Sequence, residues 1–334
     1  MRPANPGALR YTQPMDTIVL TRAQIISLLD PGAVLPALAR GFVAYSAERR
    51  IPAQRVRSPL PGATSAMLLF PGLAPDIQAY TVTVQSKNPS QNPSSSGVIA
   101  LHDLPTGALL ALLDATYLTA VRTGFSGALG AHTLARPEAG DVAVIGAGIQ
   151  GGFLLRGLSR LRPIRQVFIY DINPAQASLY AKRAEDDLGV PIVVSDSVAD
   201  AVAKADIIFT ATWARQAFLF PNMIQPGTHI TTIGADEPGK CEVSAELLRH
   251  SVFVCDDREL ADSVGAIAGA GLGPRQIHAE LGDVLAGRAT GRSGPGEITV
   301  YGAVGLAFQD LVVAWQVYHA AQLAGAGTRV SFSD

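Results

Sequence analysis

Three glycines with a fixed spacing are the residues of this sequence that point most directly to chemistry. They are Gly146, Gly148 and Gly151, and they follow directly on the apolar run 142–145. Apolar residues then recur at helical spacing, at Ile149, Phe153, Leu154 and Leu158. Glycines between a strand and a helix allow a tight turn and a close approach to a pyrophosphate, which the free N–H groups of the helix N-terminus attract. The pattern predicts a dinucleotide-binding turn that includes Ile149 and Gln150.

An acidic residue at the end of the next predicted strand bears on which dinucleotide binds. Asp171 follows the run 166–170, about twenty residues after the third glycine. A carboxylate there accepts hydrogen bonds from the ribose hydroxyls of the adenosine and repels a 2′-phosphate. We therefore expect NAD(H) as the cofactor. The alternative interpretation is a strand–turn–helix corner in which the glycines serve packing and Asp171 is an ordinary polar strand end.

The segments around this turn alternate between short apolar runs and stretches of helix length. Six runs are candidate strands, namely 142–145, 166–170, 192–194, 207–209, 229–233 and 251–254. Several of them are apolar on both faces, as strands of a buried parallel sheet are. The sequence predicts an α/β protein with a doubly wound parallel sheet domain of the Rossmann type.

The two ends of the chain have a different pattern. Capping signals at Thr21 and Asp30 predict helices near the N-terminus. Short apolar runs separated by proline and glycine predict a small sheet within 66–101. The segment 304–318 has apolar residues at helical spacing, and we expect this helix to pack on the N-terminal part or on a second subunit. These ends therefore predict an additional α+β domain.

Composition and charge exclude several classes of function. The 334 residues include 26 Lys+Arg and 28 Asp+Glu, so no basic surface for nucleic acid is expected. No apolar run is long enough to cross a bilayer, and the polar, Pro-rich first residues do not form a signal-peptide pattern. The two cysteines, Cys241 and Cys255, favour a reducing compartment and hence the cytoplasm. Neither they nor the six histidines have metal-ligand spacing, so we predict no metal site.

Further motifs, taken with the glycine turn, resemble the ornithine cyclodeaminase and mu-crystallin family over nearly the whole chain. They are Arg55 with Pro59, the segment 107–119, Arg122–Thr123, Gln150, the segments 233–236 and 238–240, and the segment 287–292. The resemblance implies a homodimer. It also implies a substrate-binding and dimerisation domain, expected from residues 1–128 with 308–334, around an NAD-binding domain, expected from residues 129–307.

The resemblance implies roles for individual residues as well. Arg55 and Arg122 match arginines that bind the substrate carboxylate, a task that suits a guanidinium because it forms two parallel hydrogen bonds. Asp236 matches the carboxylate that handles a proton on the substrate nitrogen or on an attacking water, and Thr123 falls among the cofactor-binding residues. The alternatives are a surface or interdomain ion pair for each arginine, and a cap or turn before Pro238 for Asp236.

Two positions depart from the family pattern. Thr83 stands where the family usually has a lysine that faces the substrate, and a hydroxyl does not supply that charge. Lys87 lies four residues further along the predicted strand, on the same face if no bulge intervenes, and either reaches the pocket or is a solvated loop residue. Leu68 stands where true cyclodeaminases carry an acid that holds the distal amine of ornithine. Ornithine therefore loses support as a substrate.

Together the motifs predict an NAD(H)-dependent oxidoreductase that reduces the C=N bond of a small cyclic or linear imino acid. Oxidative deamination of an amino acid, as by alanine dehydrogenases, and ornithine cyclodeamination are alternatives within the family. A catalytically silent nucleotide-binding module is the alternative of a different class. The catalytic candidates are Asp236, Thr83 and Lys87, and the substrate-binding candidates are Arg55, Arg122 and Leu68.

Overall fold

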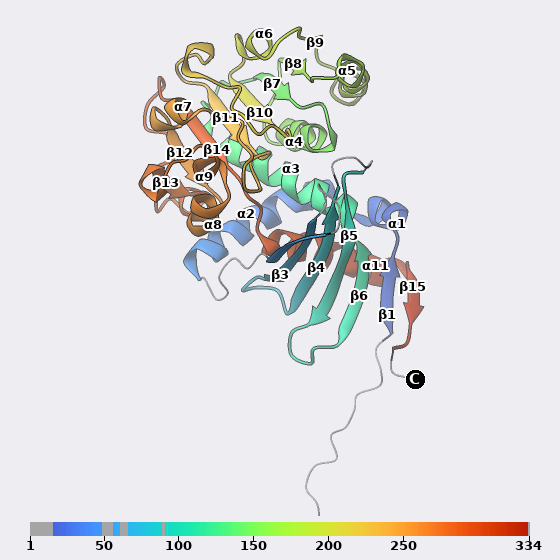
Figure 1. The fold of residues 1–334 in the computed structure, drawn as a ribbon. Coiled ribbons are helices and arrows are strands. Elements are labelled where there is room, and N and C mark those ends of the chain that lie inside the picture. The colour runs from blue at the N-terminus through green and yellow to red at the C-terminus, as the bar shows by residue number, and fades with distance from the viewer. Residues whose placement is uncertain (1–15, 49–55, 61–65, 89–90, 92, 333–334) are drawn as a thin grey trace, which may run out of the picture.

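A computed structural model describes residues 16–48, 56–60, 66–88, 91 and 93–332 of the chain. These residues form two sheets, one of seven strands and one of eight. Figure 1 shows the two sheets one above the other, with the long helix α3 (Ala115–Leu134) between them. The expected combination of a Rossmann-type domain with a second α+β domain is confirmed.

The seven-stranded sheet is built from the N-terminal part of the chain and its last strand. Its order is β15-β1-β6-β5-β4-β3-β2. All neighbouring strands pair antiparallel except β1 and β6, which are parallel. The strands are β1 (Thr17–Leu20), β2 (Val56–Pro59), β3 (Ala66–Leu73), β4 (Ala79–Lys87), β5 (Ser95–Asp103), β6 (Leu109–Asp114) and β15 (Thr328–Val330).

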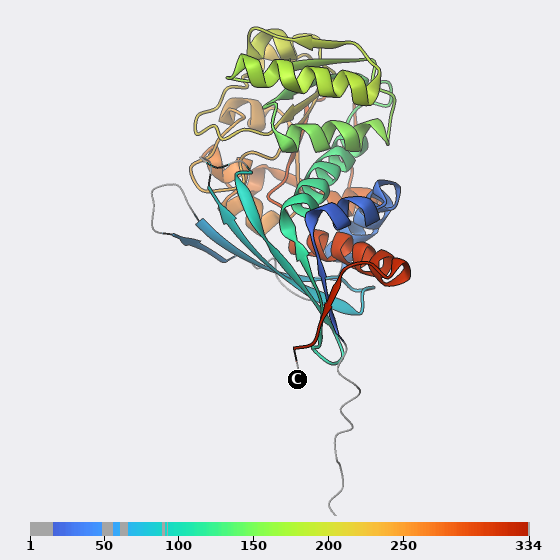
Figure 2. The ribbon, with the colours of Figure 1, turned by 90° about the vertical axis from the view of Figure 1, so that its right-hand side faces the viewer.

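Helices cover one face of this sheet (Figure 2). They are α1 (Arg22–Leu28), α2 (Pro31–Ala47), α3 and α11 (Ala307–Ala324). The predicted caps hold, because the side chains of Thr21 and Asp30 accept hydrogen bonds from the first turns of α1 and α2. The apolar stripe of α11 is buried against β3, β4, α2 and α3, with Leu311 fully inside. The last helix therefore packs on the N-terminal part of its own chain.

The eight-stranded sheet is parallel throughout, as its buried, apolar strands predict. Its order is β13-β12-β14-β11-β10-β7-β8-β9. The strands are β7 (Asp141–Ile145), β8 (Gln166–Tyr170), β9 (Ile192–Val194), β10 (Ile207–Thr210), β11 (His229–Thr232), β12 (Val252–Cys255), β13 (Ile277–Glu280) and β14 (Thr299–Gly302). The helices of this part are α4 (Ile149–Ser159), α5 (Pro174–Leu188), α6 (Val198–Val202), α7 (Ala245–Arg249), α8 (Arg258–Ser263), α9 (Ala266–Gly269) and α10 (Leu281–Leu285), with the 3₁₀ turns η1 (Pro221–Met223) and η2 (Pro274–Gln276).

Helix α3 belongs to both halves of the molecule. Fourteen of its 20 residues are buried, and it packs closely on α4. The close approach depends on Gly124, where an added Cβ would lie 2.3 Å from the Cβ of Phe153. One hydrophobic core cluster joins residues of α2, α3 and α11 to residues of β12, β13 and β14. The two halves are thus packed against each other through α3.

Several elements differ from the sequence prediction. The strands β1, β2, β6, β13, β14 and β15 had not been predicted. Strand β6 and helix α3 form one nearly continuous apolar run, and periodicity did not separate them; Asp114 ends the strand and its side chain caps the helix at Tyr117. The expected boundary between residues 128 and 129 falls inside α3. Within the described residues, no single helix meets the length and hydropathy of a membrane span, although α1 and α2 together do, with an 87° bend between them.

Candidate active site

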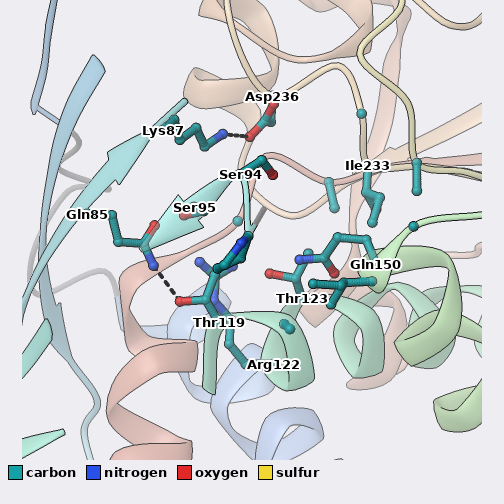
Figure 3. Close-up of a pocket in the computed structure, with 18 of the residues that line it drawn as sticks. Gln85, Lys87, Ser94, Ser95, Thr119, Arg122, Thr123, Gln150, Ile233 and Asp236 are labelled. Carbon is teal, nitrogen blue, oxygen red and sulfur yellow. Dashed lines mark hydrogen bonds and ion pairs between the residues drawn. The ribbon is translucent and has the colours of Figure 1, made fainter. Parts of the chain in front are cut away.

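A cavity of about 560 Å³ lies where the two halves of the molecule meet. Its walls come from β4, α3, the turn between β7 and α4, the loops after β10 and β11, and the start of α11, and Figure 3 shows the labelled side chains converging on it. The lining residues used below are Gln85, Lys87, Thr119, Arg122, Thr123, Gly148, Ile149, Gln150, Trp213, Asp236, Lys240, Gly305 and Gln309.

The predicted dinucleotide turn forms one wall of the cavity. Gly146 has φ +101°, a conformation that favours glycine, and an added Cβ would lie 2.6 Å from the carbonyl oxygen of Ala211. The N-cap of α4 is Gly148, which has no side-chain cap and open space where a Cβ would be. Asp171 accepts hydrogen bonds from the N–H groups of Ala147 (2.8 Å) and Asn173 (2.9 Å). The turn therefore has the free helix N-terminus and the open approach that a pyrophosphate requires.

Arg122 is held by the start of α11 at another wall. Its Nε donates to Asp310 Oδ1 at 2.8 Å, and its Nη1 donates to Gln309 Oε1 at 3.1 Å. The second oxygen of Asp310 accepts from the hydroxyl of Thr83 at 3.1 Å. All four residues are buried. The guanidinium is thus fixed in orientation, and its charge is balanced by one buried carboxylate.

Two lysines meet the Asp236 carboxylate at the far side of the cavity. Lys87 of β4 is hydrogen-bonded to Asp236 Oδ2 and lies 3.0 Å from Glu237 Oε1, while Lys240 donates to Asp236 Oδ1 at 2.9 Å. The ammonium of Lys240 also lies 3.8 Å from the centre of the Trp213 ring. Since Lys87 comes from the seven-stranded sheet and Asp236 and Glu237 follow β11, the ion pairs of Lys87 cross the cleft between the two halves, whereas the pair of Lys240 with Asp236 lies within one half.

The predicted site residues divide into four groups. Lys87, Arg122, Thr123, Gly148, Ile149, Gln150 and Asp236 line the cavity, and Gly146, Gly151 and Asp171 shape the turn beside it. Thr83 and Leu68 are fully buried and lie behind the wall, because α11 covers this face of the sheet and Asp310 engages the Thr83 hydroxyl. Arg55 lies outside the described residues.

Sequence reasoning did not single out Gln85, Thr119, Trp213 or Gln309. Gln85 lies between Thr83 and Lys87 at the two-residue spacing of one strand face, so the strand period was the available signal. Its side-chain amide is hydrogen-bonded to the Thr119 hydroxyl of α3. Gln309 had no comparable signal, because its place depends on how α11 packs. Within the described residues, no cluster of three or more His, Cys, Asp or Glu side chains is arranged to hold a metal ion.

Comparison with known proteins identifies the family to which this chain belongs. Residues 15–324 match the Ornithine cyclodeaminase/mu-crystallin family. The chain belongs to this family, as the motifs indicated.

Individual relatives cover almost the full length of the chain. The alanine dehydrogenase of Archaeoglobus fulgidus is 31% identical over 95% of this chain and 99% of its own. A Delta(1)-pyrroline-2-carboxylate reductase of Bacillus cereus is 30% identical over 94% of this chain and 100% of its own. Among solved structures, the Thermococcus litoralis Delta(1)-pyrroline-2-carboxylate reductase with NADH and L-proline has a TM-score of 0.90 at 30% identity, covering 94% of this chain and 100% of that one. An archaeal alanine dehydrogenase dimer with bound NAD has a TM-score of 0.88 at 31% identity, covering 95% and 100%.

Proposed function

We propose that the protein is an NAD(H)-dependent reductase of the C=N bond of a small cyclic or linear imino acid. The observation that carries this proposal is the shared cavity, which the dinucleotide turn, Arg122 and Asp236 line together. A dinucleotide on the turn and an imino acid on Arg122 would then lie in one space. The relatives that reduce Delta(1)-pyrroline-2-carboxylate support the choice of reaction.

Each residue of the site is assigned the role that its chemistry suits. Arg122 is oriented for a carboxylate by its contacts with Asp310 and Gln309. Asp236 lies across the cavity, where a carboxylate stabilises the proton that the substrate nitrogen must carry or receive. Arg55 is proposed, from the family pattern, to share the substrate carboxylate with Arg122. NAD(H), when bound, supplies or accepts the hydride at the carbon of the C=N bond.

The turn fits NAD(H) through features of its own. Gly148 leaves open space before the uncapped start of α4, which suits a pyrophosphate. Asp171 stands at the end of β8, where its charge opposes a 2′-phosphate. Thr123 and Gln150 line the cavity beside this turn and are proposed to contact the cofactor. Structures of relatives with bound NADH or NAD support the same choice.

The second candidate function is oxidative deamination of an amino acid. It is favoured by the 31% identity to an alanine dehydrogenase over nearly the whole chain. Ornithine cyclodeamination has less support, because Leu68 occupies the position of the distal-amine acid and is fully buried. A silent nucleotide-binding module is the remaining outcome.

The experiment is an assay of a panel of substrates, in which the absorbance of NADH measures turnover. Wild-type protein is assayed with Delta(1)-pyrroline-2-carboxylate, Delta(1)-piperideine-2-carboxylate and pyruvate with methylamine, and in reverse with proline, alanine and ornithine. We expect NADH oxidation with at least one imino acid and a higher kcat/KM in that direction than for any amino acid. Faster NAD reduction with alanine would favour the second candidate, and binding of NADH without turnover would favour the silent module.

A variant tests the assigned proton carboxylate. Asp236→Asn keeps the size of the side chain but removes its charge, so we expect kcat to fall about a hundred- to ten-thousand-fold. The Kd for NADH should stay within threefold of wild type. Asp262→Asn on α8, at an exposed position, is the matched control. An active Asp236→Asn protein would remove Asp236 from the mechanism.

Assembly and location belong to the same proposal. We assign residues 1–128 with 308–334 to a substrate-binding and dimerisation domain, and residues 129–307 to the NAD-binding domain. The helices lie on one face of the seven-stranded sheet, and the other face exposes valines such as Val84 and Val98. A homodimer formed through this open face would cover them, and an archaeal relative is a dimer.

The free cysteines Cys241 and Cys255 support a cytoplasmic location.

A further inference from the structure

The end of the cavity that Arg122 lines has an unusual charge balance. Arg122 and Asp310 form a buried ion pair at 2.8 Å, with side chains 7% and 1% exposed. Thr83 adds a neutral hydroxyl to the same carboxylate. Arg122 therefore offers an incoming carboxylate less net attraction than an unpaired arginine would. Additional donors from the chain are needed at this end.

The orientation of the Gln309 side chain follows from its contact with Arg122. A guanidinium only donates hydrogen bonds, so the Gln309 atom 3.1 Å from Arg122 Nη1 must be the carbonyl oxygen Oε1. The amide nitrogen Nε2 must then point away from the guanidinium. Nε2 has no hydrogen-bond partner among the described residues, although Gln309 is 1% exposed. A buried donor left without an acceptor is unfavourable, and a ligand that accepts from it would remove this cost.

The backbone around Gln309 favours the same kind of ligand. Gln309 lies in the first turn of α11, an 18-residue helix whose N-cap, Leu306, provides no side-chain cap. The N-terminus of such a helix carries a partial positive charge. Gly305, Gln309 and Arg122 line the same cavity, and an added Cβ at Gly305 would lie 2.7 Å from Arg122 Nη1. Arg122 and the start of α11 therefore border one space.

We infer that Gln309 is a specificity-determining residue whose side-chain amide donates to the substrate carboxylate beside Arg122. This inference rests on the proposed function, since it takes the substrate to be an imino acid. Gln309 would supply a neutral donor at the end of the cavity where Thr83 does not provide a cation. The substrate class is then a small imino acid whose carboxylate is bound by one arginine, one amide and the helix N-terminus.

The decisive variant is Gln309→Glu, which keeps the shape of the side chain and an acceptor for Arg122. It replaces the proposed donor with a negatively charged oxygen. We expect KM for Delta(1)-pyrroline-2-carboxylate to rise about ten- to a hundredfold. For 1-pyrroline, which lacks the carboxylate, kcat/KM should stay within threefold. Gln309→Leu should show the same selectivity with a smaller rise. Gln322→Glu, at an exposed position of the same helix, is the matched control and should change KM for neither compound.

Binding measurements separate this inference from the proposed function. If the wild type reduces no imine, the affinity for pyrrole-2-carboxylate is measured by calorimetry with NADH present, and pyrrole-2-carboxamide serves as the neutral probe. Tighter binding of the carboxylate by the wild type, lost in Gln309→Glu, would support the inference even without turnover. Equal KM or Kd for the carboxylate in wild type and Gln309→Glu, or equal losses for carboxylate and neutral compounds, would overturn it.

Discussion

The position of the one positive charge on β4 determines which end of the cavity it serves. Thr83, Gln85 and Lys87 share one face of the strand, and only the last is charged. Lys87 reaches Asp236 and Glu237 on the other half of the molecule. The cation of this strand thus faces the carboxylate assigned to proton transfer, while the Arg122 end is left with neutral donors.

Removal of the Lys87 charge tests its part in the site. We expect Lys87→Met to lower kcat/KM for the imino acid at least tenfold, because Asp236 and Glu237 would repel each other with one cation fewer nearby. Steady-state kinetics at saturating NADH measures the effect. Lys182→Met, at an exposed position of α5, should behave as wild type. An unchanged kcat/KM in Lys87→Met would show that the ion pairs of Lys87 are only structural.

We propose that the residues that follow β8 determine cofactor choice. Asp171 holds the backbone of the dinucleotide turn, and the next residue, Ile172, is 91% exposed. We expect the wild type to use NADH at least a hundredfold better than NADPH, measured as kcat/KM. The double variant Asp171→Ser, Ile172→Arg should reverse this ratio, because it removes the carboxylate and adds a guanidinium for the 2′-phosphate. Equal use of both cofactors by the wild type would contradict the assignment.

At the scale of elements, a buried histidine links two central strands of the parallel sheet. His229 of β11 is fully buried, and its ring nitrogens are hydrogen-bonded to the hydroxyls of Thr299 (2.9 Å) and Thr231 (2.9 Å). Burial first, and then the nearby Arg292 and Arg162 charges, lower the pKa of His229 well below its ordinary value. The imidazole is therefore neutral in the folded protein at neutral pH.

This lowered pKa makes stability depend on pH in a predictable direction. In the unfolded chain His229 takes up a proton below about pH 6.5, whereas in the folded protein it resists protonation. The free energy of unfolding should therefore fall as the pH drops below 6.5, by up to about 1.4 kcal/mol per pH unit from this group. Urea unfolding at pH 7.5, 6.5 and 5.5 should show a shallower fall for His229→Gln than for wild type. His250→Gln, at an exposed site, should retain the wild-type slope.

Local signals in the sequence predicted the elements that they control directly. The Thr21 and Asp30 caps, the glycine turn and the buried apolar strands were found because each depends on neighbouring residues. The short edge strand β15 pairs with β1 from the opposite end of the chain, so its formation depends on long-range packing. The sequence did not identify Gln309 or the place of Thr83 behind the cavity wall, because the positions of both side chains depend on how α11 packs.

For the molecule as a whole, the open face of the seven-stranded sheet is the surface that a second copy would cover. Strand β3 alternates buried and half-buried residues, so its outer side chains, including Met67 and Leu69, are apolar and only partly covered. Val84 and Val98 are paired across β4 and β5 on the same outer face, each 38% exposed. A continuous apolar face of this kind favours burial in a subunit interface.

Charge on that face should dissociate the proposed dimer. We expect light scattering at micromolar concentration to give a dimer mass for the wild type and a monomer mass for Val84→Glu, Val98→Lys. The two new charges are opposite in sign and lie across from each other, so the sheet itself should tolerate them. Val194→Glu on β9, 41% exposed, is the control and should remain dimeric. A monomeric wild type would contradict the assembly.

Helix α3 has a consequence for how enzymes of this architecture can diversify. It carries Thr119 and Arg122 toward the substrate end of the cavity and Thr123 and Ser126 within the following turn. These side chains are separated along one buried helix by about 1.5 Å per residue, and neither half of the molecule can shift that spacing without breaking the packing of α3 on α4. New substrates are therefore more readily gained by exchanging side chains on β4 and at the start of α11. A library confined to Gln85 and Gln309 would vary substrate preference while leaving the packing of α3 unchanged.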